Sequence, residues 1–273
     1  MTRGLDMSDE NEVRLGHENL IGYTRSTTQW ASKGSLRDEG RALLFAGGSW
    51  IPVVGNGAFR TDDTLGPDEL LAQADAFFAR RKRGYSIKVR DNGQDDDLRD
   101  ACEAHGLQAF GDPTPQMICH QRLAMPSLPE GISLRAVHDE QGVTDFAAVN
   151  SDAYSTYGMP AEVFADMFDR PDRLLADVDA EIVVAYQGAQ PVATALTFLS
   201  GGVASLQWVG TIAAARQMKL GRAVTVWATN LGFDRGATSV TLQASVMGAP
   251  LYLSLGYETR YHYCEHVRWT APD

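Results

Sequence analysis

The chain has 273 residues, 44% of them hydrophobic and 22% charged, an ordinary composition for a globular protein of one large domain or two smaller ones. No apolar run approaches the roughly 20 residues that span a bilayer, so we expect no membrane association. The formal net charge of −11 argues against a broad nucleic-acid surface, which needs a basic stripe, and it favours cationic partners such as amines.

The first 20 residues lack the apolar core of a secretory signal and are acidic where a transit peptide is basic. We therefore expect a flexible N-terminus over 1–20 and a cytoplasmic protein. Three cysteines, Cys102, Cys119 and Cys264, form no CxxC pair and cannot all be disulfide-bonded. This pattern fits a reducing compartment and buried thiols.

Residues 21–125 are expected to form a first domain of mixed helices and strands. An amphipathic helix is predicted over 66–83, with Leu70, Leu71, Ala74, Phe77 and Phe78 on its buried face. Its last residues, Arg80 to Arg83, suit the helix dipole better than a binding patch. The other predicted elements are strands over 42–54, 57–61, 85–90 and 107–123, and a helix over 96–105.

Residues 124–131, "AMPSLPEG", are the best linker, and they separate a second domain over 126–273. Its predicted helices cover 139–154, 160–169, 220–235 and 249–255, between strands over 132–137, 181–186, 191–199, 203–211, 238–244 and 257–269. The distance from Gly84 to Gly106 nearly equals that from Gly236 to Gly256. With the matching order of elements, this spacing indicates an internal duplication.

The segment "ARQMKLGRAV", residues 215–224, joins a predicted strand to the start of a predicted helix. A helix start exposes unpaired backbone N–H groups and the positive end of the dipole, which suits an anion. Arg216, Lys219 and Arg222 would add positive charge. On its own the pattern is more typical of an ordinary helix start with solvated basic residues.

The wider context, "VGTIAAARQMKLGRAVTVWA" followed by "GATSVTLQASVMGAPLYLSLGY", resembles the GNAT superfamily of N-acetyltransferases over about residues 131–268. That resemblance implies an α+β protein of two GNAT-like domains, each a mixed, mostly antiparallel sheet flanked by helices. It also implies a strand pair that splays at an acyl-CoA site, with acetyl-CoA as co-substrate and no metal.

The resemblance assigns CoA contacts residue by residue. Val209, Gly210 and Thr211 match the strand end that holds the pantetheine and the acyl carbonyl, and Ser245 lies where an asparagine contacting CoA is common. The pyrophosphate loop and the first turn of its helix match Arg216, Gln217, Met218, Lys219, Leu220, Gly221, Arg222 and Ala223. Lys219 departs from the family, which usually has glycine there. Its side chain would hinder close backbone approach, although it could also pair with a phosphate oxygen.

Tyr252 matches the family's general acid, which protonates the CoA thiolate as it leaves. The strand before the loop carries no carboxylate to act as a base. Asp152, Glu162, His262 and Glu265 stay open as bases that act directly or through water. The run "HYCEH", 262–266, suggests a metal site, but His262 and His266 would be about 13 Å apart along a strand, so a packed strand face is the better interpretation.

The corresponding loop of the first half, "TDDTLGPDELL", is acidic and would repel a pyrophosphate. We therefore expect a degenerate first domain that shapes the substrate cleft or a homodimer interface. The sequence predicts an N-acetyltransferase acting on a primary amine, with a non-catalytic acyl-CoA-binding protein as the alternative and a loop that binds no nucleotide as a third reading. A small molecule, a peptide N-terminus, a lysine and an aminoglycoside all stay open as acceptors.

Overall fold

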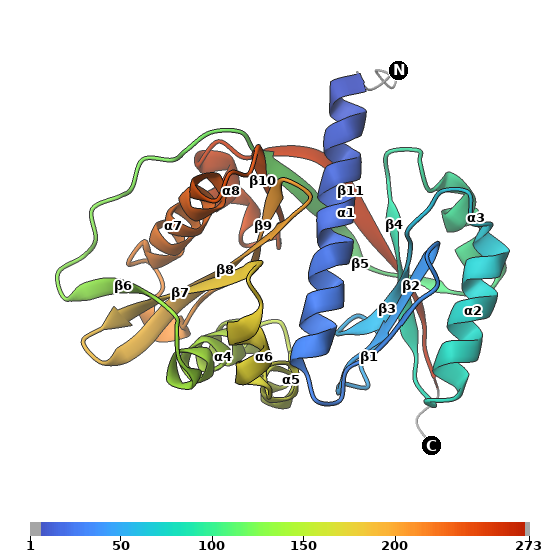
Figure 1. Ribbon diagram of the computed structural model, residues 1–273, viewed down its shortest axis with the longest axis horizontal. Coiled ribbons are helices and arrows are strands. Elements are labelled where there is room, and N and C mark those ends of the chain that lie inside the picture. Colours follow the sequence, from blue (N-terminus) through green and yellow to red (C-terminus); the bar gives the residue numbers. More distant parts are fainter. Residues whose placement is uncertain (1–6, 271–273) are drawn as a thin grey trace.

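The computed structural model describes residues 7–270, and their strands form one mixed sheet flanked by helices (Figure 1), which confirms the predicted α+β class. The strands are β1 (Ser35–Asp38), β2 (Ala42–Ala46), β3 (Asn56–Arg60), β4 (Tyr85–Arg90), β5 (Gln108–Cys119), β6 (Ile132–Ala136), β7 (Ala180–Gln187), β8 (Gln190–Ser200), β9 (Val203–Thr211), β10 (Ser239–Gln243) and β11 (Glu258–Arg268). The helices are α1 (Met7–Trp30), α2 (Pro67–Ala79), α3 (Asp96–Ala104), α4 (Glu140–Ser155), α5 (Ala161–Met167), α6 (Pro171–Ala176), α7 (Leu220–Asp234) and α8 (Ala249–Ser254), with a 3-10 turn, η1 (Ala213–Ala215).

The two halves of the chain exchange their last strands. The strand order is β1-β2-β3-β4-β11-β5-β10-β9-β8-β7-β6, so β11 pairs with β4 of the first half and β5 pairs with β10 of the second. The predicted linker, 124–131, follows β5 and leads into β6 on the opposite edge of the sheet. Each half therefore completes the sheet of the other.

The two halves repeat one order of elements, as the glycine spacing predicted. The first half runs β3, α2, β4, α3, β5, and the second runs β9, α7, β10, α8, β11. In each half the first two of these strands are parallel neighbours. Such a pair needs a crossover connection, which α2 supplies in one half and α7 in the other.

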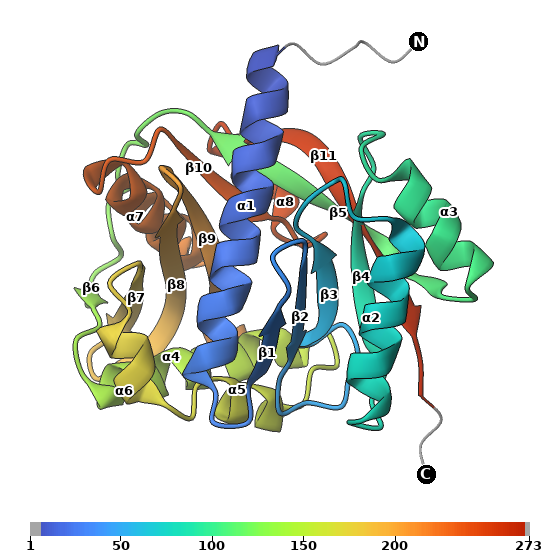
Figure 2. The ribbon, with the colours of Figure 1, turned by 45° about the vertical axis from the view of Figure 1, so that its right-hand side comes forward.

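Helix α1 is the largest difference from the predicted elements, because Met7–Trp30 is helical where a flexible segment was expected over 1–20. It stands across the middle of the molecule and contacts β1 and β2 on one side and β8 and β9 on the other (Figures 1 and 2). Val13 and Leu20 are buried, and the Asn19 side-chain amide donates to the carbonyl of Val203 at 2.7 Å. Docking between the halves holds the helix. The remainder of the segment that was predicted to be flexible, residues 1–6, lies outside the described part.

Both sheet halves are covered on two faces, so their strands are apolar on both sides. In β2, Leu43 belongs to the core beneath α1 and α4, while Leu44 belongs to the core beneath α2. In β7, Val184 belongs to the core beneath α4, and Val183 belongs to the core beneath α7. Alternate residues of a strand point to opposite faces, so this arrangement requires runs such as "ALLFA" and "EIVVAY".

The predicted face of α2 is confirmed, since its five apolar residues are all buried. The helix ends at Ala79, before the predicted 83, and Lys82 adopts a positive φ of 50° just beyond it. The strand predicted over 42–54 was too long. It ends at Ala46, and residues 47–55 form a loop whose carbonyls at Ser49 and Ile51 accept from the Asn56 side-chain amide at 2.8 and 2.9 Å.

All three cysteines are free thiols, with Cys102 and Cys119 buried as predicted and Cys264 half-buried. Burial raises the pKa of the Cys102 thiol to about 12, so this side chain is an inert part of the core at neutral pH. Over residues 7–270, the helices fall short of the length and apolar character needed to cross a bilayer.

Candidate active site

Strands β9 and β10 separate where the resemblance predicts a splay. Their parallel pairing runs from Val203–Ser239 to Leu206–Leu242, after which β10 ends and β9 continues to Thr211. Beyond this point β9 bulges against β8, and Trp208 has a positive φ of 52°. The bulge releases the edge of β9 that faces away from β8, so its backbone groups are free to meet a ligand.

The loop between β9 and α7 adopts a conformation that normally needs glycine. Gln217 has a φ of 68° and Lys219 a φ of 61°, and Lys219 is the N-cap of α7 in the left-handed region. A non-glycine residue pays roughly 1–2 kcal/mol there, because its Cβ crowds the following carbonyl. The chain therefore keeps the backbone path of the loop despite its lysine.

The start of α7 has the physical features of an anion site. The backbone N–H groups of Leu220, Gly221 and Arg222 donate no hydrogen bond within the described structure. Gly221 leaves space, since a Cβ there would meet nothing closer than 3.5 Å. The dipole of this 15-residue helix also favours a negative charge at its N-terminus.

Three basic side chains surround this helix start, and within residues 7–270 none of them meets a carboxylate. The Arg222 guanidinium donates to the Ser254 hydroxyl at 2.6 Å, and the Arg216 guanidinium lies 3.4 Å from the Thr156 hydroxyl. Lys219 is exposed. Their charge is therefore available to a phosphate-bearing ligand.

Most predicted CoA contacts line one cavity, called here the α7 cavity, of about 410 Å³ between α7, α8 and the end of β9. Met218 and Ala223 do not line it, because Met218 packs against the core beneath α7 and Ala223 is buried. Ser245 is exposed at its rim and accepts from the Tyr157 hydroxyl at 3.1 Å. The predicted residues lining the cavity are Val209, Gly210, Thr211, Arg216, Gln217, Lys219, Leu220, Gly221, Arg222, Ser245 and Tyr252.

Tyr252 lies in the wall of this cavity on the short helix α8. Its ring packs edge-on against Tyr257, with 5.9 Å between the ring centroids. Gly248 leaves the ring its space, since a Cβ there would come within 2.8 Å of it. Burial raises the pKa of Tyr252 well above its usual value of 10, so the hydroxyl stays protonated at neutral pH. Within the described structure this hydroxyl donates no hydrogen bond to the protein, so its proton is free for a ligand.

The four candidate bases are scattered, and the α7 cavity includes none of them. Asp152 accepts from the backbone N–H of Ala213 at 2.6 Å, and Glu162 is exposed on α5. His262 is paired with Asp91 across β11 and β4, while His266 is buried. Among residues 7–270, three or more His, Cys, Asp or Glu side chains nowhere gather as metal ligands. Glu265 pairs with Lys88 and lines a different cavity.

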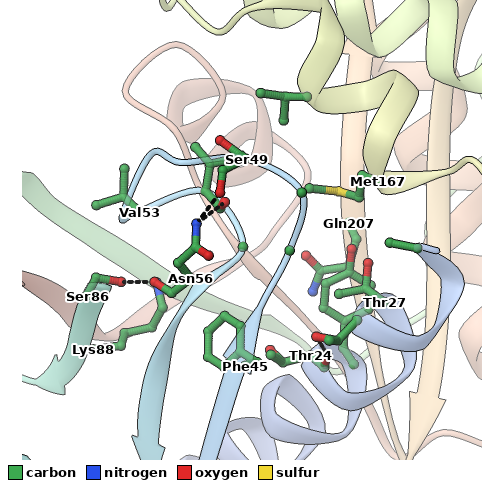
Figure 3. A pocket seen from close by; sticks show the side chains of 18 of the residues that line it. Thr24, Thr27, Phe45, Ser49, Val53, Asn56, Ser86, Lys88, Met167 and Gln207 are labelled. Carbon is green, nitrogen blue, oxygen red and sulfur yellow. Dashed lines mark hydrogen bonds between the residues drawn. The ribbon is translucent and has the colours of Figure 1, made fainter. Parts of the chain in front are cut away.

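That different cavity, called here the central cavity, lies between the two halves and has a volume of about 260 Å³ (Figure 3). Its walls come from α1, β2, the loop 47–55, β3, β4, α5, β9, β10 and β11. The sequence did not predict it, because its lining residues are spread from Leu20 to Glu265 without a local pattern. Only the exchange of strands and the docking of α1 bring them together.

The first half closes the place that corresponds to the α7 cavity. Arg60 and Arg90, at the ends of the parallel strands β3 and β4, are 4% exposed, and both pair with buried Asp95 at 2.7 Å. These guanidinium groups hold the pKa of Asp95 well below its usual range, although burial alone would raise it. The next helix, α2, has Asp68 and Glu69 in its first turn. Negative charge at that helix start disfavours an anion.

Comparison with solved structures shows which fold this is. The chain is similar to a GCN5-related N-acetyltransferase from Kribbella flavida at 20% identity, with a TM-score of 0.65 over 87% of this chain and 90% of that one. A GCN5-related N-acetyltransferase from Sphaerobacter thermophilus is 17% identical, with a TM-score of 0.61 over 85% and 81%. A tandem GNAT protein from the clavulanic acid biosynthesis pathway is 13% identical, with a TM-score of 0.59 over 89% and 85%.

Comparison of the sequence alone identifies no relative, since no family model and no curated protein matches the chain. The structural likeness covers both halves, so the chain has the tandem GNAT fold that the sequence resemblance implied.

Proposed function

We propose that the chain is an acyltransferase that moves an acetyl group from acetyl-CoA to a primary amine by direct transfer, in the cytoplasm. One observation carries the proposal. A single cavity joins a helix start with unpaired backbone N–H groups, the free edge of a splayed strand and Tyr252. The fold shared with GCN5-related N-acetyltransferases supports the same chemistry.

The residues of the α7 cavity fit the CoA part of the co-substrate. The pyrophosphate would accept from the N–H groups of Leu220, Gly221 and Arg222, with Arg216 and Lys219 close enough to add charge. The pantetheine, which carries amides, would pair with the released edge of β9 at Val209 to Thr211. Lys219 does not oppose this fit, because its backbone already has the left-handed conformation that the loop requires.

In the proposed reaction the neutral amine attacks the thioester carbonyl, a C–N bond forms and the C–S bond breaks. Tyr252 donates its proton to the leaving thiolate and regains one from the nitrogen of the tetrahedral intermediate through water. The products are an amide, CoA thiol and one proton released to solvent. Because the described lining of the α7 cavity holds no Asp, Glu or His, we propose that water takes the first proton from the ammonium group.

Binding is tested by calorimetric titration of acetyl-CoA into the native protein and the variant Arg216→Ala. Arg122→Ala is the matched control, because Arg122 is an exposed arginine that pairs with Asp234 away from the α7 cavity. We expect micromolar affinity that Arg216→Ala weakens about tenfold, as for the loss of one charge-assisted phosphate contact. An affinity for acetyl-CoA that is absent, or equal in all three proteins, refutes the CoA site.

Catalysis is tested by CoA release with an amine panel, using Tyr252→Phe. A lost general acid typically lowers kcat by 10²- to 10⁴-fold, and acetyl-CoA affinity should stay within about twofold. Tyr186→Phe is the control, since it removes a tyrosine hydroxyl that donates to Asp145 outside both cavities. Tight acetyl-CoA binding without CoA release from any amine would instead indicate the non-catalytic acyl-CoA-binding protein.

A further inference from the structure

The central cavity and the α7 cavity meet at one strand. Gln207 and Trp208 of β9 line the central cavity, and the next residue, Val209, lines the α7 cavity. Consecutive Cα atoms are 3.8 Å apart, so the two cavities are separated by about one residue of β9. A ring contact also shows that the two cavities are close, because Tyr154 of the α7 cavity lies edge-on to Trp208, with 5.4 Å between the ring centroids.

This wall is also the place where β9 has lost its partner. Pairing with β10 ends at Leu206, and the bulge at Trp208 follows directly. Gln243, the last residue of β10, lines the central cavity on the other side of the gap. A molecule in the central cavity therefore reaches the strand edge along which the thioester would lie, from the side opposite to the CoA loop.

The lining of the central cavity is mainly apolar. Leu20 and Phe59 are buried there, with Phe45 and Met167 facing the same space, and the loop 47–55 covers one end (Figure 3). The hydroxyl groups of Thr24, Thr27, Thr28 and Ser49 also line it. A volume of about 260 Å³ is at the small end of ligand pockets. This volume disfavours an acceptor as large as a peptide or an aminoglycoside.

The end of the cavity farthest from β9 offers unpaired hydrogen-bond acceptors. Asn56 is 1% exposed, and its amide nitrogen is occupied by loop carbonyls while its Oδ1 has no partner. Glu265 pairs with Lys88 through Oε1, and its buried Oε2 has no partner. Gln116 of β5 is paired with Gln243 on one side and with Tyr261 of β11 on the other. Glu265 is four residues beyond Tyr261, so it lies roughly 13 Å along the strand direction from this row of paired residues.

We infer that the central cavity binds the acceptor, and that the acceptor is a small primary amine with an apolar body and a hydrogen-bond donor at its opposite end. The amine lies at Gln207 and Trp208, and the donor reaches Asn56 Oδ1 and Glu265 Oε2. The two carboxylates of the lining are already paired, Glu265 with Lys88 and Asp166 with Lys33. This inference rests on the proposed acyl transfer and narrows its substrate. Glu265 thereby becomes a binding group instead of a base.

The test uses the native protein, acetyl-CoA and five amines: tyramine, phenethylamine, spermidine, kanamycin and a tetrapeptide with a free N-terminus. Tyramine has both a flat apolar body and a terminal hydroxyl donor, and phenethylamine lacks only the hydroxyl. We expect tyramine to give the highest kcat/KM of the five, at least tenfold above phenethylamine, since a buried acceptor left unpaired is costly. Spermidine, kanamycin and the peptide should react at least 100-fold less efficiently than tyramine.

A cavity-filling variant separates the acceptor site from the CoA site. Thr27 is half-buried on α1 and lines the central cavity, so Thr27→Phe should raise the KM for tyramine at least tenfold while the Kd for acetyl-CoA stays within twofold. Gln29→Phe is the control, because Gln29 is exposed on the same helix and lines neither cavity.

The outcomes distinguish the two proposals. If the native protein does not bind acetyl-CoA, the proposed function itself is overturned. Normal acetyl-CoA binding with spermidine, kanamycin or the peptide as the best acceptor overturns only the inference about the acceptor, as does the absence of turnover with tyramine. Equal effects of Thr27→Phe and Gln29→Phe on KM also overturn it.

Discussion

Acid should weaken the attachment of α1 through a single buried histidine. His17 is 7% exposed, and its Nδ1 lies 2.8 Å from the Tyr263 hydroxyl while its Nε2 lies 3.5 Å from the Arg60 carbonyl. Burial, together with the charge of nearby Arg90, lowers the pKa of His17 from 6.5 to about 4. The folded protein therefore holds this ring neutral at pH values where the unfolded chain binds a proton.

The direction and size of the effect follow from this difference. The stability that comes from neutral His17 is complete above pH 6.5 and is lost as the pH falls towards 4, because only the unfolded state gains the proton. The lowering of the pKa from 6.5 to about 4 corresponds to about 3 kcal/mol in the free energy of unfolding. Roughly 2 kcal/mol of this should be lost between pH 7 and pH 4.5.

Urea unfolding of the native protein and of His17→Asn at both pH values measures this contribution. Asparagine keeps hydrogen-bonding groups at the site but cannot take up a proton. The free energy of unfolding of the native protein should fall by about 2 kcal/mol more than that of the variant over this range. An equal fall in both proteins would show that His17 is not neutral inside the fold, and would refute the reasoning.

Three further predictions concern the loop, the core and the central cavity. Lys219→Gly should raise the free energy of unfolding by about 0.5–1 kcal/mol in urea, since the relief of left-handed strain exceeds the added entropy of the unfolded chain, and a destabilised variant would contradict the φ of 61°. Phe146→Ala should lower that free energy by about 3–5 kcal/mol, because Phe146 is fully buried between α4 and the sheet, and a loss under 1 kcal/mol would contradict its place in the core. Asn56→Ala should release the loop 47–55 and increase its cleavage by a nonspecific protease several-fold, while unchanged cleavage would show that other contacts hold the loop.

The sequence predicted the elements whose signal is local. Helices α2 and α7 were found because their apolar residues recur on one face and a glycine follows each end. The residues of the α7 cavity were assigned through the resemblance to GNAT proteins, whose motifs for the loop and Tyr252 lie in one short stretch of the chain. Met218 was assigned to the loop and Ala223 to the first turn of the helix by position, but both side chains pack into the core instead of lining the cavity.

The remaining features depend on contacts between distant parts of the chain. Helix α1 is mostly polar, and residues such as Asn19 and His17 become informative only when β9 and β11 lie against them. The exchange of β5 and β11 could not be predicted, because the local pattern of a strand does not show which neighbouring strand it pairs with. The central cavity could not be predicted for the same reason, because its walls belong to both halves.

The exchanged strands make the protein an intramolecular counterpart of a domain-swapped dimer. A ribosome completes β4 long before it makes β11, so the first half must wait with one sheet edge unpaired until the last residues of the sheet have been synthesised. Fragments cut at the linker 124–131 would each lack an inner strand and should associate with each other, because only together do they restore the sheet order. We therefore expect the two halves to unfold together in a single transition.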